Sequence, residues 1–276
     1  MTTPGPMATP GPLNPVSRTA LSVAHVRALE SERPGGLFTD PYARAFVTAA
    51  GYTPGRQPGP YALSLANYAV IRTRFYDEYL LRAVADGIRQ VVLPAAGLDT
   101  RAYRLPWPDG VRLYELDLPP VLEFKERVLA GQGAGPRCER AALDVDLTGE
   151  DWGSRLAAAG FDREAPSAWL VEGLFVYLTG EQAAGLLDTL GGLAAPGSRL
   201  AHERGRDVSA AGAGDPSVAH LTSLWKGGLG TGLGDWLGRH GWHVETHPLD
   251  AVAARYGRSW TGTGPDMAGF HLSTRG

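Results

Sequence analysis

The sequence predicts an α/β protein with a doubly wound, mostly parallel sheet. From residue 90 onward, short apolar runs bounded by turn residues alternate with longer segments of helical periodicity. This alternation is typical of parallel strands joined by crossover helices. A turn containing one glycine follows the first run, and an acidic residue ends the second. In doubly wound folds both positions lie at the carboxyl ends of the strands, where ligands bind.

Seven segments are expected to form strands, so the sheet is predicted to be seven-stranded. They span residues 90–93, 111–116, 137–145, 168–172, 198–203, 242–247 and 269–273. The helices expected among them span residues 119–130, 151–160, 180–193 and 235–241. Strands with near-continuous apolar runs are buried on both faces, so these helices should cover both sides of the sheet.

Residues 16–88 precede the first strand and are expected to form an N-terminal helical cap. Apolar residues at helical spacing predict helices over residues 19–30, 40–50 and 61–87. Asp40 is the expected N-cap of the second of these helices, and Pro41 its first residue.

Two segments do not fit a regular pattern. Residues 1–15 are rich in Pro, Gly and Thr, which predicts a flexible tail. Residues 205–234 are rich in Gly and Ala without clear periodicity, and long excursions of this kind are often lids. The remainder, residues 16–276 with the lid insertion included, is expected to be a single domain.

Composition narrows the class of protein. A formal net charge of -3 argues against nucleic acid or an anionic membrane as partner. Cys138 is the only cysteine, which excludes an intramolecular disulfide and fits a reducing compartment. No apolar run approaches the roughly 18 residues of a membrane span, and the N-terminus lacks the pattern of a signal peptide. We therefore expect a cytoplasmic protein, monomeric or homodimeric, with a small-molecule substrate and no metal.

The glycine turn and the acid at the end of the second strand predict a nucleoside site. Gly97 lets the backbone approach a ligand closely, and Asp117 is placed to accept hydrogen bonds from ribose hydroxyls. A dinucleotide site would need three glycines, and Asp99 would repel a pyrophosphate. A ligand with an ammonium group and no phosphate, such as S-adenosylmethionine, suits the turn better. The alternative is an ordinary turn in which both acids are helix caps.

The residues of this turn resemble the first motif of the leucine carboxyl methyltransferase-like family of class I S-adenosylmethionine-dependent methyltransferases. The motif runs Ala95-Ala96-Gly97-Leu98-Asp99-Thr100-Arg101. Similar segments follow the family's order at residues 27–30, 40–43, 72–77, 114–119, 144–147, 172–178, 241–242 and 256–258. The resemblance extends from Thr19 to the C-terminus and implies a Rossmann-like fold. Pro94 departs from the pattern, which usually has an apolar residue with a free N–H at the end of the first strand.

The resemblance implies S-adenosyl-L-methionine as cofactor, S-adenosyl-L-homocysteine as product, and a set of binding residues. The implied cofactor-binding residues are Arg72, Ala95, Gly97, Asp99, Asp117, Leu118, Asp146, Leu147 and Glu172. Arg72 would pair with the methionine carboxylate, and Asp146 with the adenine amine.

Structural alternatives stay open for three of these residues, and one further residue aligns loosely. Arg72 could instead lie on the surface of its helix, and Asp146 could be an acid at the start of a helix. Glu172 could form the floor of the methyl-donor site or belong to an ion pair with a purely structural role. Arg27 is a further candidate by loose alignment.

The expected reaction is O-methylation of a small molecule, with a methyl ester on a carboxylate favoured and a role in secondary metabolism. A carboxylate is already nucleophilic at neutral pH, whereas a phenol or alcohol would need a general base. His202 and Tyr177 are the candidate catalytic residues. Candidate acceptor-binding residues are Tyr61, Tyr68, Tyr76, Tyr177 and Trp225.

Three other functions remain open at this stage. They are a phenol or hydroxyl O-methyltransferase, a cofactor-binding protein of this fold that performs a non-methylating reaction, and a nicotinamide dehydrogenase. The missing glycines count against the dehydrogenase.

Overall fold

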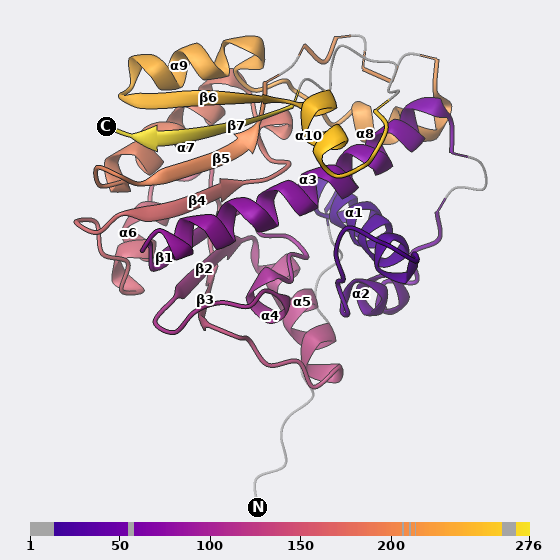
Figure 1. The fold of residues 1–276 in the computed structure, drawn as a ribbon, viewed down its shortest axis with the longest axis horizontal. Helices are drawn as coiled ribbons and strands as arrows, with labels where there is room; N and C mark the ends of the chain where they lie inside the picture. Colours follow the sequence, from indigo (N-terminus) through magenta and orange to yellow (C-terminus); the bar gives the residue numbers. More distant parts are fainter. Residues whose placement is uncertain (1–13, 55–57, 206, 210, 213, 261–268) are drawn as a thin grey trace, which may run out of the picture.

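The structure is a computed structural model that describes residues 14–54, 58–205, 207–209, 211–212, 214–260 and 269–276. At its centre lies a seven-stranded sheet in the order β3-β2-β1-β4-β5-β7-β6 (Figure 1). The strands are β1 (Gln90–Pro94), β2 (Arg112–Asp117), β3 (Glu139–Asp144), β4 (Ser167–Val171), β5 (Arg199–Glu203), β6 (Trp242–Pro248) and β7 (Gly269–Arg275). Among these described strands, β7 runs antiparallel to its neighbours β5 and β6, and the other pairings are parallel. The predicted fold class is confirmed.

Helices cover both faces of the sheet, and alternate strand residues pack against them. In β1, Val91 and Leu93 join the apolar cluster that includes α3 (Pro60–Ala85), whereas Val92 joins a second cluster with α7 (Gly180–Leu193). The α7 bounds match the prediction because Thr179 forms a capping box at its start. The other helices after β1 are α4 (Arg101–Arg104), α5 (Pro119–Gly131), α6 (Trp152–Ala158), α9 (Leu233–Arg239) and α10 (Leu249–Arg255). The short helices α4 and α10 were not predicted.

The N-terminal cap consists of α1 (Pro15–Glu32), α2 (Ala43–Ala49) and α3. α1 begins earlier than expected, because the Asn14 side chain accepts a hydrogen bond from Ser17 N at 2.7 Å and Pro15 takes the first helical position. α1 thus includes Pro15, which was predicted to belong to the flexible tail. Residues 1–13 of that predicted tail lie outside the described residues. α2 begins later than expected, since the Asp40 carboxylate accepts from the N–H groups of Tyr42 and Ala43 and holds a turn ahead of the helix.

The segment at 205–234, which is described except for residues 206, 210 and 213, contains three short helical turns. They are η2 (Pro216–Val218), α8 (Ala219–Thr222) and η3 (Gly230–Gly232). The Asp215 carboxylate accepts from Tyr61 N at 3.1 Å and Ala62 N at 3.2 Å, at the start of α3. Lys226 N donates to Val176 O at 2.7 Å. The segment is therefore tied both to the helical cap and to the loop after β4.

No helix in the described part of the chain is both long enough and apolar enough to cross a membrane.

Candidate functional site

A cavity of about 880 Å³ opens at the carboxyl ends of β1 to β5, with further walls from α1, α3 and the segment 205–234. Its volume is near the upper end of the roughly 300–1,000 Å³ typical of small-molecule sites. Every residue that the family resemblance implies for cofactor binding lines it: Arg72, Ala95, Gly97, Asp99, Asp117, Leu118, Asp146, Leu147 and Glu172. The fold thus brings together residues that the sequence only suggested as a set.

The turn after β1 is held by the acid at the end of β2. Asp117 Oδ2 accepts from Gly97 N at 2.6 Å, and its Oδ1 accepts from Leu118 N at 2.7 Å. Burial raises the pKa of this carboxyl above its ordinary value, against the lowering effect of the two N–H bonds. The Asp117 carboxylate is therefore fixed in orientation at the cavity wall.

Two residues of this turn adopt left-handed backbone conformations. Gly97 has φ +52°, and Ala95 has φ +54°, the only positive value among the described non-glycine residues. A Cβ on Gly97 would lie 3.6 Å from Ala20 Cβ, an ordinary contact, so conformation rather than space calls for glycine there. Pro94 ends β1 without disturbing its pairing with Leu116, and the path into Gly97 runs through the strained Ala95.

Asp146 lies in the exposed turn after β3. Its Oδ1 accepts from Thr148 N at 2.9 Å and from Thr148 Oγ1 at 2.7 Å. α6 begins only at Trp152, so Asp146 holds a local turn and does not cap that helix. The turn presents both Asp146 and Leu147 to the cavity.

Arg72 does not point to solvent, so the alternative of a surface helix residue is wrong. Its side chain is 11% exposed; Nε donates to Glu172 Oε1 and Nη1 to Glu203 Oε1, both at 2.9 Å. Glu203, at the end of β5, also accepts from Gly173 N at 2.7 Å and lines the cavity. Sequence reasoning missed Glu203, although its place at a strand end was the available signal.

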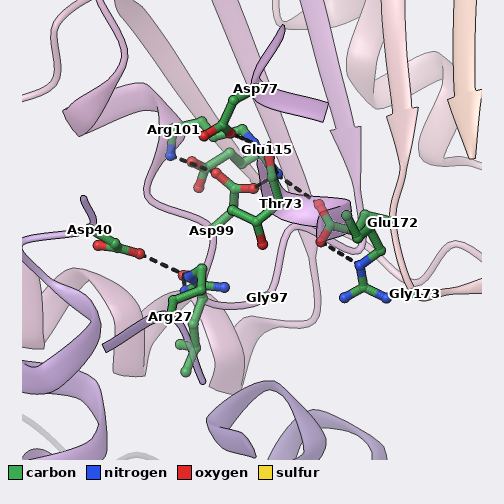
Figure 2. A network of polar contacts seen from close by, with 12 residues as sticks. Arg27, Asp40, Thr73, Asp77, Gly97, Asp99, Arg101, Glu115, Glu172 and Gly173 are labelled. Atoms are coloured by element: carbon green, nitrogen blue, oxygen red, sulfur yellow. Dashed lines mark hydrogen bonds and ion pairs between the residues drawn. The ribbon is translucent and has the colours of Figure 1, made fainter. Parts of the chain in front are cut away.

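A second arginine, Arg101, joins the turn to Glu172. Its Nε donates to Asp77 Oδ1 at 2.7 Å and its Nη1 to Glu172 Oε2 at 2.8 Å, and it also pairs with Asp99 (Figure 2). Burial raises the pKa of Asp99, but Arg101 and more distant cations outweigh it and lower the value to about 2. In the same way, burial raises the pKa of Glu172, but Arg101 and Arg72 bring it below its ordinary value. Asp99 and Glu172 are therefore ionised members of one buried charge network.

Sequence reasoning did not assign roles to Arg101, Asp77 or Arg104. Arg104 pairs with both carboxylate oxygens of Asp77, at 2.6 and 2.7 Å. The signals were present, because Arg101 ends the quoted turn motif and Asp77 ends the segment 72–77. What was missing was the fact that the two motifs face each other.

Arg27 ties the helical cap to the turn after β1. Its Nε donates to Asp40 Oδ2 at 2.8 Å and its Nη2 to the carbonyl of Leu98 at 2.6 Å, with both side chains buried (Figure 2 shows the Asp40 pair). Arg27 lines the cavity as well. Its contacts position the turn from the side of α1.

The structure does not place His202 in the cavity, which corrects the expectation that it could act as a base there. The ring is fully buried, lies 5.1 Å from the His271 ring and 5.6 Å from the Phe175 ring, and donates from Nδ1 to the carbonyl of Glu203. Burial, with a smaller contribution from His271, lowers the pKa of His202 to about 3. His202 lies on the opposite face of β5 from Glu203, because side chains alternate between faces along a strand.

Of the candidate acceptor-binding residues, Tyr68, Tyr177 and Trp225 line the cavity. The Arg72 guanidinium lies 5.6 Å from the centre of the Tyr68 ring. Tyr177 contacts Thr19 of α1 through its hydroxyl at 3.3 Å. Tyr61 and Tyr76 do not line the cavity, because both are buried and Tyr76 packs on Phe270. The expectation that these two residues bind the acceptor is therefore corrected.

The sequence pattern that defines the leucine carboxyl methyltransferase family matches residues 20–191 of the chain. The chain belongs to the leucine carboxyl methyltransferase family. A protein of Parafrankia sp. is 45% identical over 94% of this chain and 87% of its own length. A protein of Frankia alni is 47% identical, with 94% of each chain covered. Both are named as candidate S-adenosyl-L-methionine-dependent methyltransferases.

Solved structures support the fold. A DUF574 family protein from Streptomyces avermitilis has a TM-score of 0.56 at 15% identity, over 92% of this chain and 97% of that chain. Magnesium protoporphyrin IX methyltransferase from Synechocystis, with bound S-adenosylhomocysteine, has a TM-score of 0.51 at 14% identity, over 84% and 93%. The family match, the named relatives and the fold agree: the chain is an S-adenosylmethionine-dependent methyltransferase with a class I fold.

Proposed function

We propose that this member of the leucine carboxyl methyltransferase family forms a methyl ester on the carboxylate of a small molecule. The observation that carries the proposal is the position of His202, the histidine that the sequence offered as a base, which is buried away from the cavity and cannot act there. A carboxylate needs none, because it is already ionised at neutral pH. We extend the proposal to an acceptor from secondary metabolism.

The residues around the cavity suit each part of the methyl donor. Arg72 would hold the methionine carboxylate, since a guanidinium matches a carboxylate in two-point contact. Asp117, fixed by two N–H groups, would accept from the ribose hydroxyls. Asp146 would accept from the adenine amine, and the backbone of Leu147 would read a ring nitrogen. Glu172 would orient Arg72 at the wall of the site, through the ion pair that the two side chains form.

The bound donor supplies an electrophilic methyl group: a carboxylate oxygen forms the new C–O bond while the S–C bond breaks and its electron pair stays on sulfur. The protein's own contribution is to align the two reactants and exclude water. Tyr68, Tyr177 and Trp225 are the lining aromatic residues that would position the acceptor.

A hydroxyl acceptor is the second candidate, because one observation favours it. His25 of α1 lines the cavity, and its Nδ1 is buried without a hydrogen-bond partner among the described residues. Burial, followed by the charge of Arg44, lowers the pKa of His25, so the ring is neutral at pH 7 and could accept a proton. A phenol or alcohol would require such a base.

Product chemistry separates these functions. The protein is incubated with S-adenosylmethionine labelled in the methyl group and with matched panels of carboxylic acids and phenols. A methyl ester releases labelled methanol in mild alkali, whereas a methyl ether does not. Alkali-labile product supports the proposal, and alkali-stable product that disappears in His25→Gln supports the hydroxyl acceptor. Cofactor binding without transfer to any acceptor would favour a non-methylating reaction.

A further inference from the structure

The walls of the cavity change character away from the strand ends. Where α1, α3 and the segment 205–234 form the wall, many of the lining side chains are apolar, among them Val23, Val26, Leu65, Ala66, Leu221 and Leu229. The acids that line the cavity, by contrast, all lie at or just after strand ends: Asp99, Asp117, Asp146, Glu172 and Glu203. Among the described residues, the helical cap and the segment 205–234 therefore contribute apolar surface but no carboxylate to the cavity.

The apolar surface continues to the outside of the molecule. In the described part of the chain, the large apolar side chains that are exposed are Val16, Leu29 and Leu63, at 37%, 51% and 57%, and all three line this cavity. Exposed apolar side chains gathered at one opening mark a binding surface. A ligand that covered them would extend from the cavity to its mouth on α1 and α3.

Two cations that line the cavity are held beside strand ends. Arg204 directly follows Glu203 at the end of β5, and Lys226 is anchored through its backbone to Val176 after β4. Among the described residues, neither side chain forms an ion pair with a carboxylate, in contrast to Arg27 and Arg72. The charge at this point complements an acidic group.

We infer that the methyl acceptor is an amphipathic carboxylic acid. Its acid group lies near Arg204 and Lys226, and its apolar body runs under the helical cap and out to Leu29 and Leu63. The inference rests on the proposed ester formation and adds the substrate class. Arg204 and Lys226 draw the acid group to the strand ends by charge, while the length of the apolar body sets the affinity.

A chain-length series tests this inference. The acids are butanoate, octanoate, dodecanoate and hexadecanoate, and the readout is kcat/KM for alkali-labile methyl transfer. Each methylene that enters the cavity should raise kcat/KM about fourfold until the cavity is filled. Leu29→Gln and Leu63→Gln should each reduce the ratio of dodecanoate to butanoate at least threefold. Leu81→Gln, at a half-buried leucine outside the cavity, is the matched control and should leave the ratio unchanged.

Charge variants test the other end of the acceptor. Arg204→Gln and Lys226→Gln should raise KM for every acid at least fivefold, while Arg239→Gln on the exposed side of α9 should not change it. Affinity for S-adenosylhomocysteine, measured by calorimetry, shows that each variant is folded. Ester formation at equal kcat/KM along the series overturns the inference and leaves the proposed function standing. Transfer to phenols with no ester from any acid overturns both.

Discussion

The guanidinium of Arg72 and the carboxylate of Glu172 meet at 2.9 Å, from Nε to Oε1, in the wall of the cavity. Glu172 uses its other oxygen to accept from Arg101, so one carboxylate joins α3, the start of α4 and the end of β4. All three side chains are at most 17% exposed. Solvent therefore screens these charges weakly, and removing one should be felt by its partners.

Glu172→Gln should lower both stability and cofactor affinity. The amide cannot neutralise Arg72 and Arg101, so we expect a loss of about 1–3 kcal/mol in the free energy of unfolding, measured in urea. The dissociation constant of S-adenosylhomocysteine should rise at least tenfold. Glu32→Gln, which breaks the exposed pair with Arg44, is the control and should change neither quantity. A Glu172→Gln protein with normal stability would show that the network is dispensable.

Asp117→Ala should weaken cofactor binding at least tenfold, which corresponds to roughly 1–3 kcal/mol for lost charged hydrogen bonds. The change also frees the N–H groups of Gly97 and Leu118, so the turn itself should loosen. Calorimetry with S-adenosylhomocysteine measures the effect. Asp188→Ala, at an exposed position on α7, serves as control. Equal affinities for Asp117→Ala and the unaltered protein would remove Asp117 from the site.

Ala95→Gly should stabilise the protein. A left-handed conformation costs an L-residue about 1–2 kcal/mol, and glycine escapes that cost but loses about 0.5–1 kcal/mol through greater freedom in the unfolded chain. The net gain in the free energy of unfolding should be about 0.5–1 kcal/mol. Ala95→Val should be destabilising, because a β-branched residue is less tolerant of this conformation. Urea unfolding of the two variants should therefore shift in opposite directions.

Stability should fall when the pH drops below about 6.5. The pKa of His202 is about 3 in the folded protein, mainly through burial, and about 6.5 when unfolded. Between these values the unfolded chain binds the extra proton, so the stabilising contribution is complete above pH 6.5 and is lost toward pH 3 with a slope of up to about 1.4 kcal/mol per pH unit. His271, with a pKa lowered to about 4, acts in the same direction.

Urea unfolding at about pH 7.5, 6 and 5, on either side of the pKa of free histidine, measures the pH effect. His202→Gln should flatten the slope over this range. His240→Gln, at an exposed ring stacked on Trp236, should leave it as it is. An identical slope in all three proteins would assign the acid sensitivity to other groups.

The fold was predictable because its signals are local. α7 was predicted with its observed bounds, and its start is fixed locally, because Thr179 and Gln182 form a capping box within four neighbouring residues. The starts of α1 and α2 were misplaced, although Asn14 and Asp40 both accept hydrogen bonds from nearby N–H groups. Asn14 caps a helix and Asp40 holds a turn ahead of one, and the residue pattern does not distinguish these two roles. α10 was missed because its seven residues are too few to establish a helical period.

The site was predictable in part. Strand ends meet at one edge of a parallel sheet, which is why Gly97 and Asp117 could be grouped before the structure was known, whereas Asp146 was added by the family resemblance. Pairings across the fold could not be anticipated. Arg101 and Asp77 belong to separate motifs, and nothing local indicates that they meet.

The sequence by itself determined the succession of the seven strands, the family and the acids that gather at the strand ends, because periodicity, capping and turn chemistry act over a few residues. Only the tertiary structure decided that Arg72 turns inward to Glu172 and Glu203, while His202 turns away from the cavity. The partner of a buried charge is set by the packing of segments that lie about a hundred residues apart in the chain.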